Sequence, residues 1–87
     1  MNKCLNYNIK DVEYLKTRGD ILCRVIREWL LENGVDALVH DFAIEEKATL
    51  VVDYSFDKNT KEEKVKKLTE QILKRFNITY KLEKMII

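Results

Sequence analysis

Alternating apolar and polar residues predict four β-strands along the chain. The first covers residues 3–9, and the next two cover residues 36–45 and 48–56. The last begins at Ile78 and continues to Ile86. A period of two places alternate side chains on opposite faces of a sheet, so each strand is expected to bury one side only. Whether residues 3–9 form a strand stays open, because that pattern is short.

Apolar residues spaced three and four apart predict two amphipathic helices. The first lies within residues 11–33, and Gly34 is well placed to end it in a left-handed conformation. Gly19 lies inside this pattern, where it either breaks the helix or allows another part of the chain to approach closely. The second helix follows a capping box formed by Thr60 and Glu63.

The resulting order is strand, helix, strand, strand, helix, strand. This order predicts an α+β fold of the ferredoxin-like βαββαβ type, a two-layer sandwich in which two helices cover one face of a four-stranded antiparallel sheet. A chain of 87 residues is expected to form a single α+β domain over residues 1–87. If the first strand is absent, the alternative is an αββαβ chain that completes its sheet by dimerisation.

The loop between the second and third strands decides which side chains face outward. A three-residue loop over residues 45–47, or a five-residue loop in the same register, pairs Phe42 with Leu50 and His40 with Val52, so that apolar sides match. In this register no aromatic side chain lies on the uncovered face, which argues against base stacking there. A flat face of small residues suits contact with another protein. The two middle strands are expected to present Ala37, Val39, Asp41, Ala43, Thr49, Val51, Asp53 and Ser55.

Charge is unevenly distributed, although the whole chain has a net charge of only +1. Residues 28–57 carry one base and eight acids, a net −7, between a segment of +3 and a segment of +5. Gathered in space, these acids would attract a protein partner with a basic surface and speed its encounter. The residues predicted to bind a partner, from these acids and from the flat face together, are Asp41, Asp53, Glu45, Glu46, Val39 and Val51.

The basic side of the second helix gives an alternative interpretation. Its lysines and arginine could follow a phosphate backbone. Glutamates lie between them, however, and the Glu63–Lys67 and Glu70–Lys74 spacings favour a solvated, salt-bridged helix face. The residues predicted for nucleic-acid binding under this alternative are Lys61, Lys64, Lys67, Lys74 and Arg75.

The sequence contains no recognisable catalytic motif, so an enzyme is not expected. His40 is the only histidine, and its expected position on the core side favours a structural role. No serine or cysteine is linked to it by a motif. Asp41 and Asp53 would supply too few ligands for a metal, and neither glycine belongs to a phosphate-binding loop. No cofactor or metal site is therefore predicted.

Localisation is expected to be cytoplasmic, in the cell or in a host cell. No apolar run reaches the roughly 18 residues of a membrane span, and the first residues do not resemble a signal peptide. Cys4 and Cys23 are too few for a disulfide framework and fit reduced thiols.

The functional hypothesis is a non-enzymatic protein–protein interaction or regulatory module that forms a homodimer. A specific version is an inhibitor, encoded by a virus or mobile element, of a nucleic-acid-processing complex. The alternative is a small nucleic-acid-binding module that uses the basic second helix.

Overall fold

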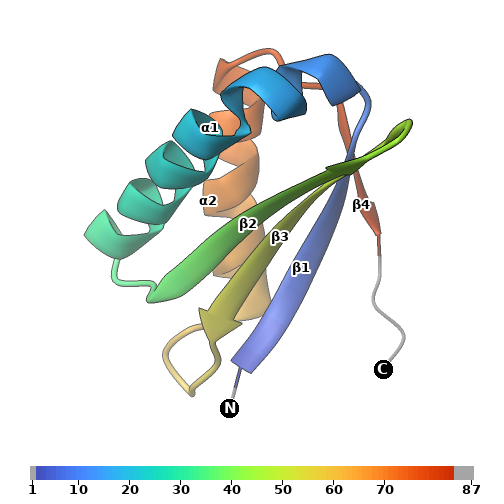
Figure 1. The fold of residues 1–87 in the computed structure, drawn as a ribbon. Coiled ribbons are helices and arrows are strands. Elements are labelled where there is room, and N and C mark those ends of the chain that lie inside the picture. The colour runs from blue at the N-terminus through green and yellow to red at the C-terminus, as the bar shows by residue number, and fades with distance from the viewer. Residues whose placement is uncertain (1, 84–87) are drawn as a thin grey trace.

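A computed structural model describes residues 2–83 of the chain. It confirms the predicted ferredoxin-like α+β arrangement, with both helices on one side of the sheet (Figure 1). The elements in chain order are β1 (Asn2–Ile9), α1 (Val12–Glu32), β2 (Ala37–Ile44), β3 (Lys47–Ser55), α2 (Glu62–Arg75) and β4 (Tyr80–Glu83).

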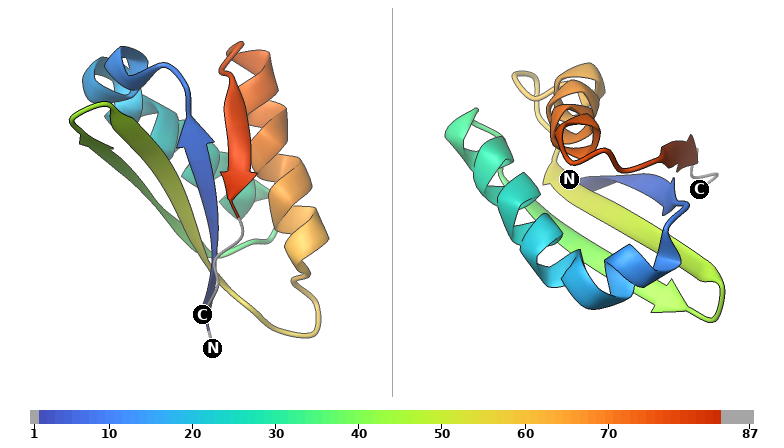
Figure 2. Two further views of the ribbon diagram at one scale, coloured as in Figure 1. Left: turned by 90° about the vertical axis from the view of Figure 1, so that its right-hand side faces the viewer. Right: turned by 90° about the horizontal axis from the view of Figure 1, so that it is seen from above.

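The sheet has the strand order β2-β3-β1-β4, and all neighbouring strands are antiparallel. β2 and β4 are therefore the two edges. The views in Figure 2 place α1 along the β2 side of the sheet and α2 along the β4 side. The opposite face of the sheet carries no helix of the described chain, and we call it the open face.

β1 forms a complete central strand, so the prediction for residues 3–9 is confirmed. Its apolar set, Leu5, Tyr7 and Ile9, is buried beneath the helices. With β1 paired on both sides, the sheet has four strands within one chain and the αββαβ alternative is not needed. The largest fully buried side chains include Tyr7, Tyr54, Ile9, Leu15, Leu22, Ile26, Leu30, Leu50 and Leu73.

α1 runs without a break through Gly19 to Glu32, and Gly34 forms the turn that ends it, as predicted. The Asp11 side chain accepts a hydrogen bond from the Tyr14 N–H at 3.0 Å and caps its first turn. At the other end Gly34 has φ +82°, and the Val35 N–H donates to the Leu30 carbonyl at 2.8 Å. This is the Schellman ending, which a glycine makes without steric cost.

α2 begins at Glu62, two residues after Thr60, so the predicted capping box is wrong. No side chain caps this helix at Lys61. Thr60 is held instead in the preceding turn, where its N–H donates to the Asp57 carboxylate at 2.8 Å. Asn59 N–H donates to the same carboxylate oxygen at 2.7 Å, and these bonds lower the pKa of Asp57.

β4 is short and pairs with the last four residues of β1, from Asn6 to Ile9. Tyr80 and Leu82 continue the core-facing side of the sheet, as the alternation predicts, and Ile78 is buried just before the strand. The continuation predicted as far as Ile86 lies outside the described residues.

Candidate interaction surface

The β2–β3 hairpin has a different register from the one predicted. Its loop is the two residues Glu45 and Glu46, closed by the pair Ile44 and Lys47. Asp41 therefore lies opposite Leu50, and the predicted three-residue loop is wrong. Because side chains alternate along a strand, this shift of one residue turns every side chain of β2 to the other face.

The reason for this register lies in the space between α1 and β2. A Cβ at Gly19 would overlap the Asp41 carboxylate, so helix and strand approach each other closely here. Small side chains fit beneath the helix, and β2 supplies them in Ala37, Val39 and Ala43. Gly19 therefore permits a close approach, which was one of the two roles considered for it, and it does not break the helix.

The large side chains of β2 lie on the open face as a consequence. Leu38 is 49% exposed, Phe42 is 52% exposed and Ile44 is 70% exposed. His40 lies between them, with its ring centroid 6.4 Å from that of Phe42. We call Leu38, His40, Phe42 and Ile44 the β2 stripe. The prediction of an open face without aromatic residues, and of His40 on the core side, is therefore wrong.

The central strands give the open face a different, polar character. β1 contributes Asn6 and Asn8, and the Asn8 amide donates to the Glu83 carboxylate of β4 at 3.3 Å. β3 contributes Val51 and Asp53, as predicted. Burial, followed by the nearby charge of Asp53, raises the pKa of the Cys4 thiol on the same face. Within the described chain, the large exposed apolar side chains of this face belong to β2.

The residues predicted to bind a partner do not form one surface. They lie in three places: the helix side of β2 (Val39, Asp41), the open face (Val51, Asp53) and the hairpin tip (Glu45, Glu46). The acidic middle of the chain is divided in the same way, because strand alternation separates acids that are close in sequence. Asp41 and Asp53, both expected on the uncovered face, lie on opposite faces of the sheet.

Asp41 instead takes part in a contact between β2 and α1. The Cys23 thiol lies 3.7 Å from an Asp41 carboxylate oxygen and donates a weak hydrogen bond to it. Burial, with the negative charge of Asp41 beside it, raises the pKa of Cys23 to about 12. A thiol with so high a pKa is a poor nucleophile, so this pair is a packing contact.

A groove runs between α1 and the edge of β2, on the helix side of the sheet. Its volume is about 450 Å³. Leu31 at its rim is 64% exposed, and Arg24 and Arg27 have no carboxylate within 4 Å among the described residues. The lining residues are Cys23, Arg24, Arg27, Glu28, Leu31 and Val39. Sequence reasoning missed this groove, because it depends on how α1 lies against β2.

The charged face of α2 is exposed and only partly ion-paired. Of its charges, Lys66 and Glu70 form the one ion pair within 4 Å in the described chain, at 3.4 Å. The predicted ion pairs Glu63–Lys67 and Glu70–Lys74 are not formed within 4 Å. The five bases predicted for nucleic-acid binding are all exposed: Lys61, Lys64, Lys67, Lys74 and Arg75.

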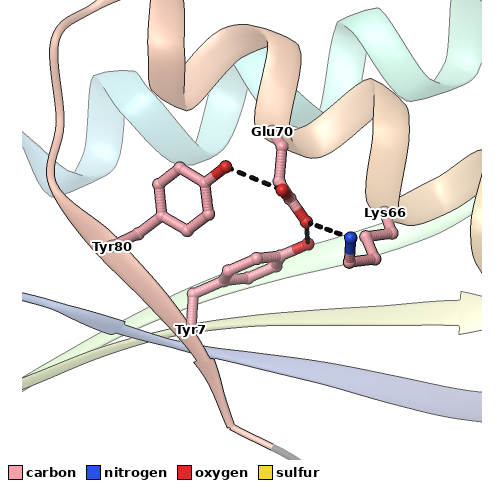
Figure 3. A network of polar contacts seen from close by, with 4 residues as sticks. All are labelled: Tyr7, Lys66, Glu70 and Tyr80. Atoms are coloured by element: carbon pink, nitrogen blue, oxygen red, sulfur yellow. Dashed lines mark hydrogen bonds and ion pairs between the residues drawn. The ribbon is translucent and has the colours of Figure 1, made fainter.

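Glu70 also connects α2 to the sheet through two tyrosines (Figure 3). Its carboxylate accepts hydrogen bonds from the hydroxyls of Tyr80 at 2.7 Å and Tyr7 at 3.2 Å. Burial and the bonds to Glu70 raise the pKa of both tyrosines, that of Tyr80 to about 12. Protonated tyrosines and a carboxylate held by Lys66 make a structural contact between layers, without a nucleophile or a free base.

Metal ligands, membrane spans and known relatives give no further indication of function. Residues 2–83 contain no group of three or more His, Cys, Asp or Glu side chains placed to hold a metal. Neither helix is long and apolar enough to cross a membrane. The chain matches no protein-family model and no curated protein sequence.

Proposed function

We propose that the chain is a non-enzymatic interaction module that binds another protein through the β2 stripe. The observation that carries the proposal is the exposure of Leu38, Phe42 and Ile44 in one row on an edge strand. Contiguous exposed apolar side chains with a polar surround are typical of protein-binding sites. The polar surround is supplied here by the asparagines and Asp53 of the central strands.

Nucleic-acid binding through the open face has less support. RNA-binding sheets stack bases on aromatic side chains of their central strands, whereas His40 and Phe42 lie on an edge strand. The charged side chains of the open face, Lys47, Asp53, Lys81 and Glu83, carry two positive and two negative charges and do not make it basic. Phosphate groups would therefore find little attraction there.

Charge attraction is not what the proposal rests on. Because the acids of residues 28–57 are divided among α1, the loop before β2, both faces of the sheet, the hairpin tip and the turn after β3, they do not favour a strongly basic partner. The hypothesis that the chain inhibits a nucleic-acid-processing complex depends on attraction by those acids. The identity of the partner therefore stays a hypothesis.

A capture experiment from lysate of the source cells tests the proposal. The immobilised chain is compared with a triple variant, Leu38→Ser, Phe42→Ser and Ile44→Ser. Ile21→Ser is the matched control, since Ile21 is 62% exposed but lies on α1. The proposal predicts a protein retained by wild type and control and lost by the triple variant. Identical retention by all three, or none by any, overturns it.

The basic face of α2 supports a second candidate, because its four predicted bases, together with Lys61 just before the helix, are exposed and without ion pairs in the described chain. Nucleic-acid binding there would weaken steeply with salt. A mobility-shift assay at low salt with Lys64→Glu and Lys67→Glu tests it. Absence of any shift by the wild-type chain ends this second candidate.

A further inference from the structure

The outer edge of β2 offers main-chain hydrogen-bonding groups to a ligand. In a hairpin closed by Ile44 and Lys47, the even-numbered residues of β2 bond to β3. The Ser55 N–H donates to the Asp36 carbonyl at 3.0 Å, which continues this alternation. The odd-numbered residues therefore direct their N–H and C=O groups away from the sheet. These are Ala37, Val39, Asp41 and Ala43.

Among residues 2–83, this edge lacks the usual features that prevent pairing. Edge strands are commonly protected by proline, by lysine or by a covering segment. β2 contains neither residue, and its single carboxylate, Asp41, is held against Gly19 and Cys23 of the same chain. β2 is eight residues long, so its free edge is long enough for several hydrogen bonds.

Binding surfaces lie on both sides of the free edge. On the open side is the β2 stripe, and on the helix side is the groove between α1 and β2. A strand added to the edge would direct alternate side chains to these two sides. One set would lie beside Leu38 and Phe42, and the other would enter the groove beside Arg24 and Arg27. Recognition by strand addition gains affinity from the main chain and specificity from such alternate side chains.

Charge in the groove indicates the kind of segment that fits. Arg24 and Arg27 have no ion pair within 4 Å in the described chain, and Glu28 only partly offsets them. An acidic side chain entering the groove would complete a charge-assisted hydrogen bond. A second copy of the chain would instead bring its own two arginines to the shared edge, and like charges disfavour that pairing.

We infer that the edge of β2 binds an extended segment of a partner protein as a fifth strand. This inference rests on the proposed function and adds the mode of binding and the chemistry of the partner. The segment alternates apolar side chains, which lie against the β2 stripe, with acidic side chains, which lie in the groove.

Selection from a displayed library of random eight-residue peptides tests the inference on the full chain. We expect enriched peptides with acidic residues at alternate positions. A selected peptide should protect the outward amides of Ala37, Val39, Asp41 and Ala43 from hydrogen exchange. Selection against an Arg24→Glu, Arg27→Glu variant should lose the acidic preference. Arg18→Glu, on another side of α1, should keep it.

Val39→Pro tests the main-chain contact directly. It removes an outward N–H without breaking a bond to β3, a position where an edge strand tolerates proline. We expect the selected peptide to bind at least about tenfold more weakly, the effect of losing about one hydrogen bond. Val39→Ala is the control that shortens the same side chain and keeps the N–H, and it should bind nearly as well as wild type.

Several outcomes would overturn the inference. One is enrichment of no peptide, and another is binding that leaves the four outward amides unprotected. A third is protection of those amides that rises with protein concentration in the absence of peptide, since a second copy would then occupy the edge. A lysate partner that is lost with the triple stripe variant but retained by Val39→Pro overturns strand addition and leaves the proposed function standing.

Discussion

Gly19 of α1 lies directly against the carboxylate of Asp41 on β2. The carboxylate occupies the space that a Cβ would need if any other residue stood at position 19. This contact sets how closely the helix approaches the edge strand. It explains why β2 directs small side chains towards the helix and large ones towards the open face. The β2 stripe and the adjacent groove both follow from it.

Gly19→Ala should destabilise the fold by about 1–3 kcal/mol, because overpacking forces the helix and strand apart. The gain in helix propensity, about 1 kcal/mol, works in the opposite direction. Asp41→Ala removes the group that the new methyl would meet, so the double variant should recover much of the loss. Denaturant unfolding of both single variants and the double variant measures the coupling. Strictly additive effects would show that the two residues do not meet.

Substitutions in the β2 stripe should have little effect on folding. Phe42→Ser and Ile44→Ser should each change the free energy of unfolding by about 2 kcal/mol or less, because half or more of each residue is already exposed. Leu50→Ala, on the buried side of β3, should cost about 2–5 kcal/mol. Urea titrations make the comparison. A loss for Phe42→Ser equal to that for Leu50→Ala would mean that Phe42 is a core residue.

The two thiols should differ in reactivity. Burial and the Asp41 charge raise the pKa of Cys23 to about 12, and Cys23 is buried, whereas Cys4 is partly exposed. At mildly alkaline pH, iodoacetamide should therefore alkylate Cys4 before Cys23, as followed by peptide mass spectrometry. Asp41→Ala should speed the reaction of Cys23 and leave that of Cys4 unchanged. Equal rates in the wild-type chain would contradict the buried contact.

Stability should fall as pH rises above about 10, the ordinary pKa of tyrosine. The folded state holds the pKa of Tyr80 at about 12 and also raises that of Tyr7, so it binds more protons than the unfolded state in this range. Unfolding then becomes easier with each increase in pH. Tyr80→Phe should reduce this slope. Unfolding measured from about pH 9 to about pH 11 checks it, and a slope that Tyr80→Phe leaves unchanged would count against the Glu70 contact.

Much of the fold could be predicted because most elements bury a single, unambiguous set of side chains. Leu5, Tyr7 and Ile9 alternate with polar residues in β1, and the parity of β3 is equally plain. β2 differs, since both of its sides are apolar, and matching the larger side chains to the core gave the wrong face. The two-residue loop also lacked the glycine or asparagine that usually signals it, although Glu45 adopts φ +56° there.

The candidate surface was harder to predict because it depends on contacts between distant segments. Two features of the sequence together signal that α1 and β2 approach closely. They are the small side chains in β2 and the glycine in the middle of α1. That signal becomes decisive only when Gly19 and Asp41 are known to lie side by side. The groove has no local pattern in the sequence, since its residues come from one side of α1 and a single position of β2.

The register of the β2–β3 hairpin is the point on which the proposed surface depends, and nuclear magnetic resonance can measure it directly. Hα protons approach closely across the non-hydrogen-bonded pairs of an antiparallel ladder. We predict strong Hα–Hα contacts between Asp41 and Leu50 and between Val39 and Val52. Contacts between Asp41 and Val51 and between Ala43 and Thr49 in their place would mean the three-residue loop, which returns the stripe to the core and contradicts the account.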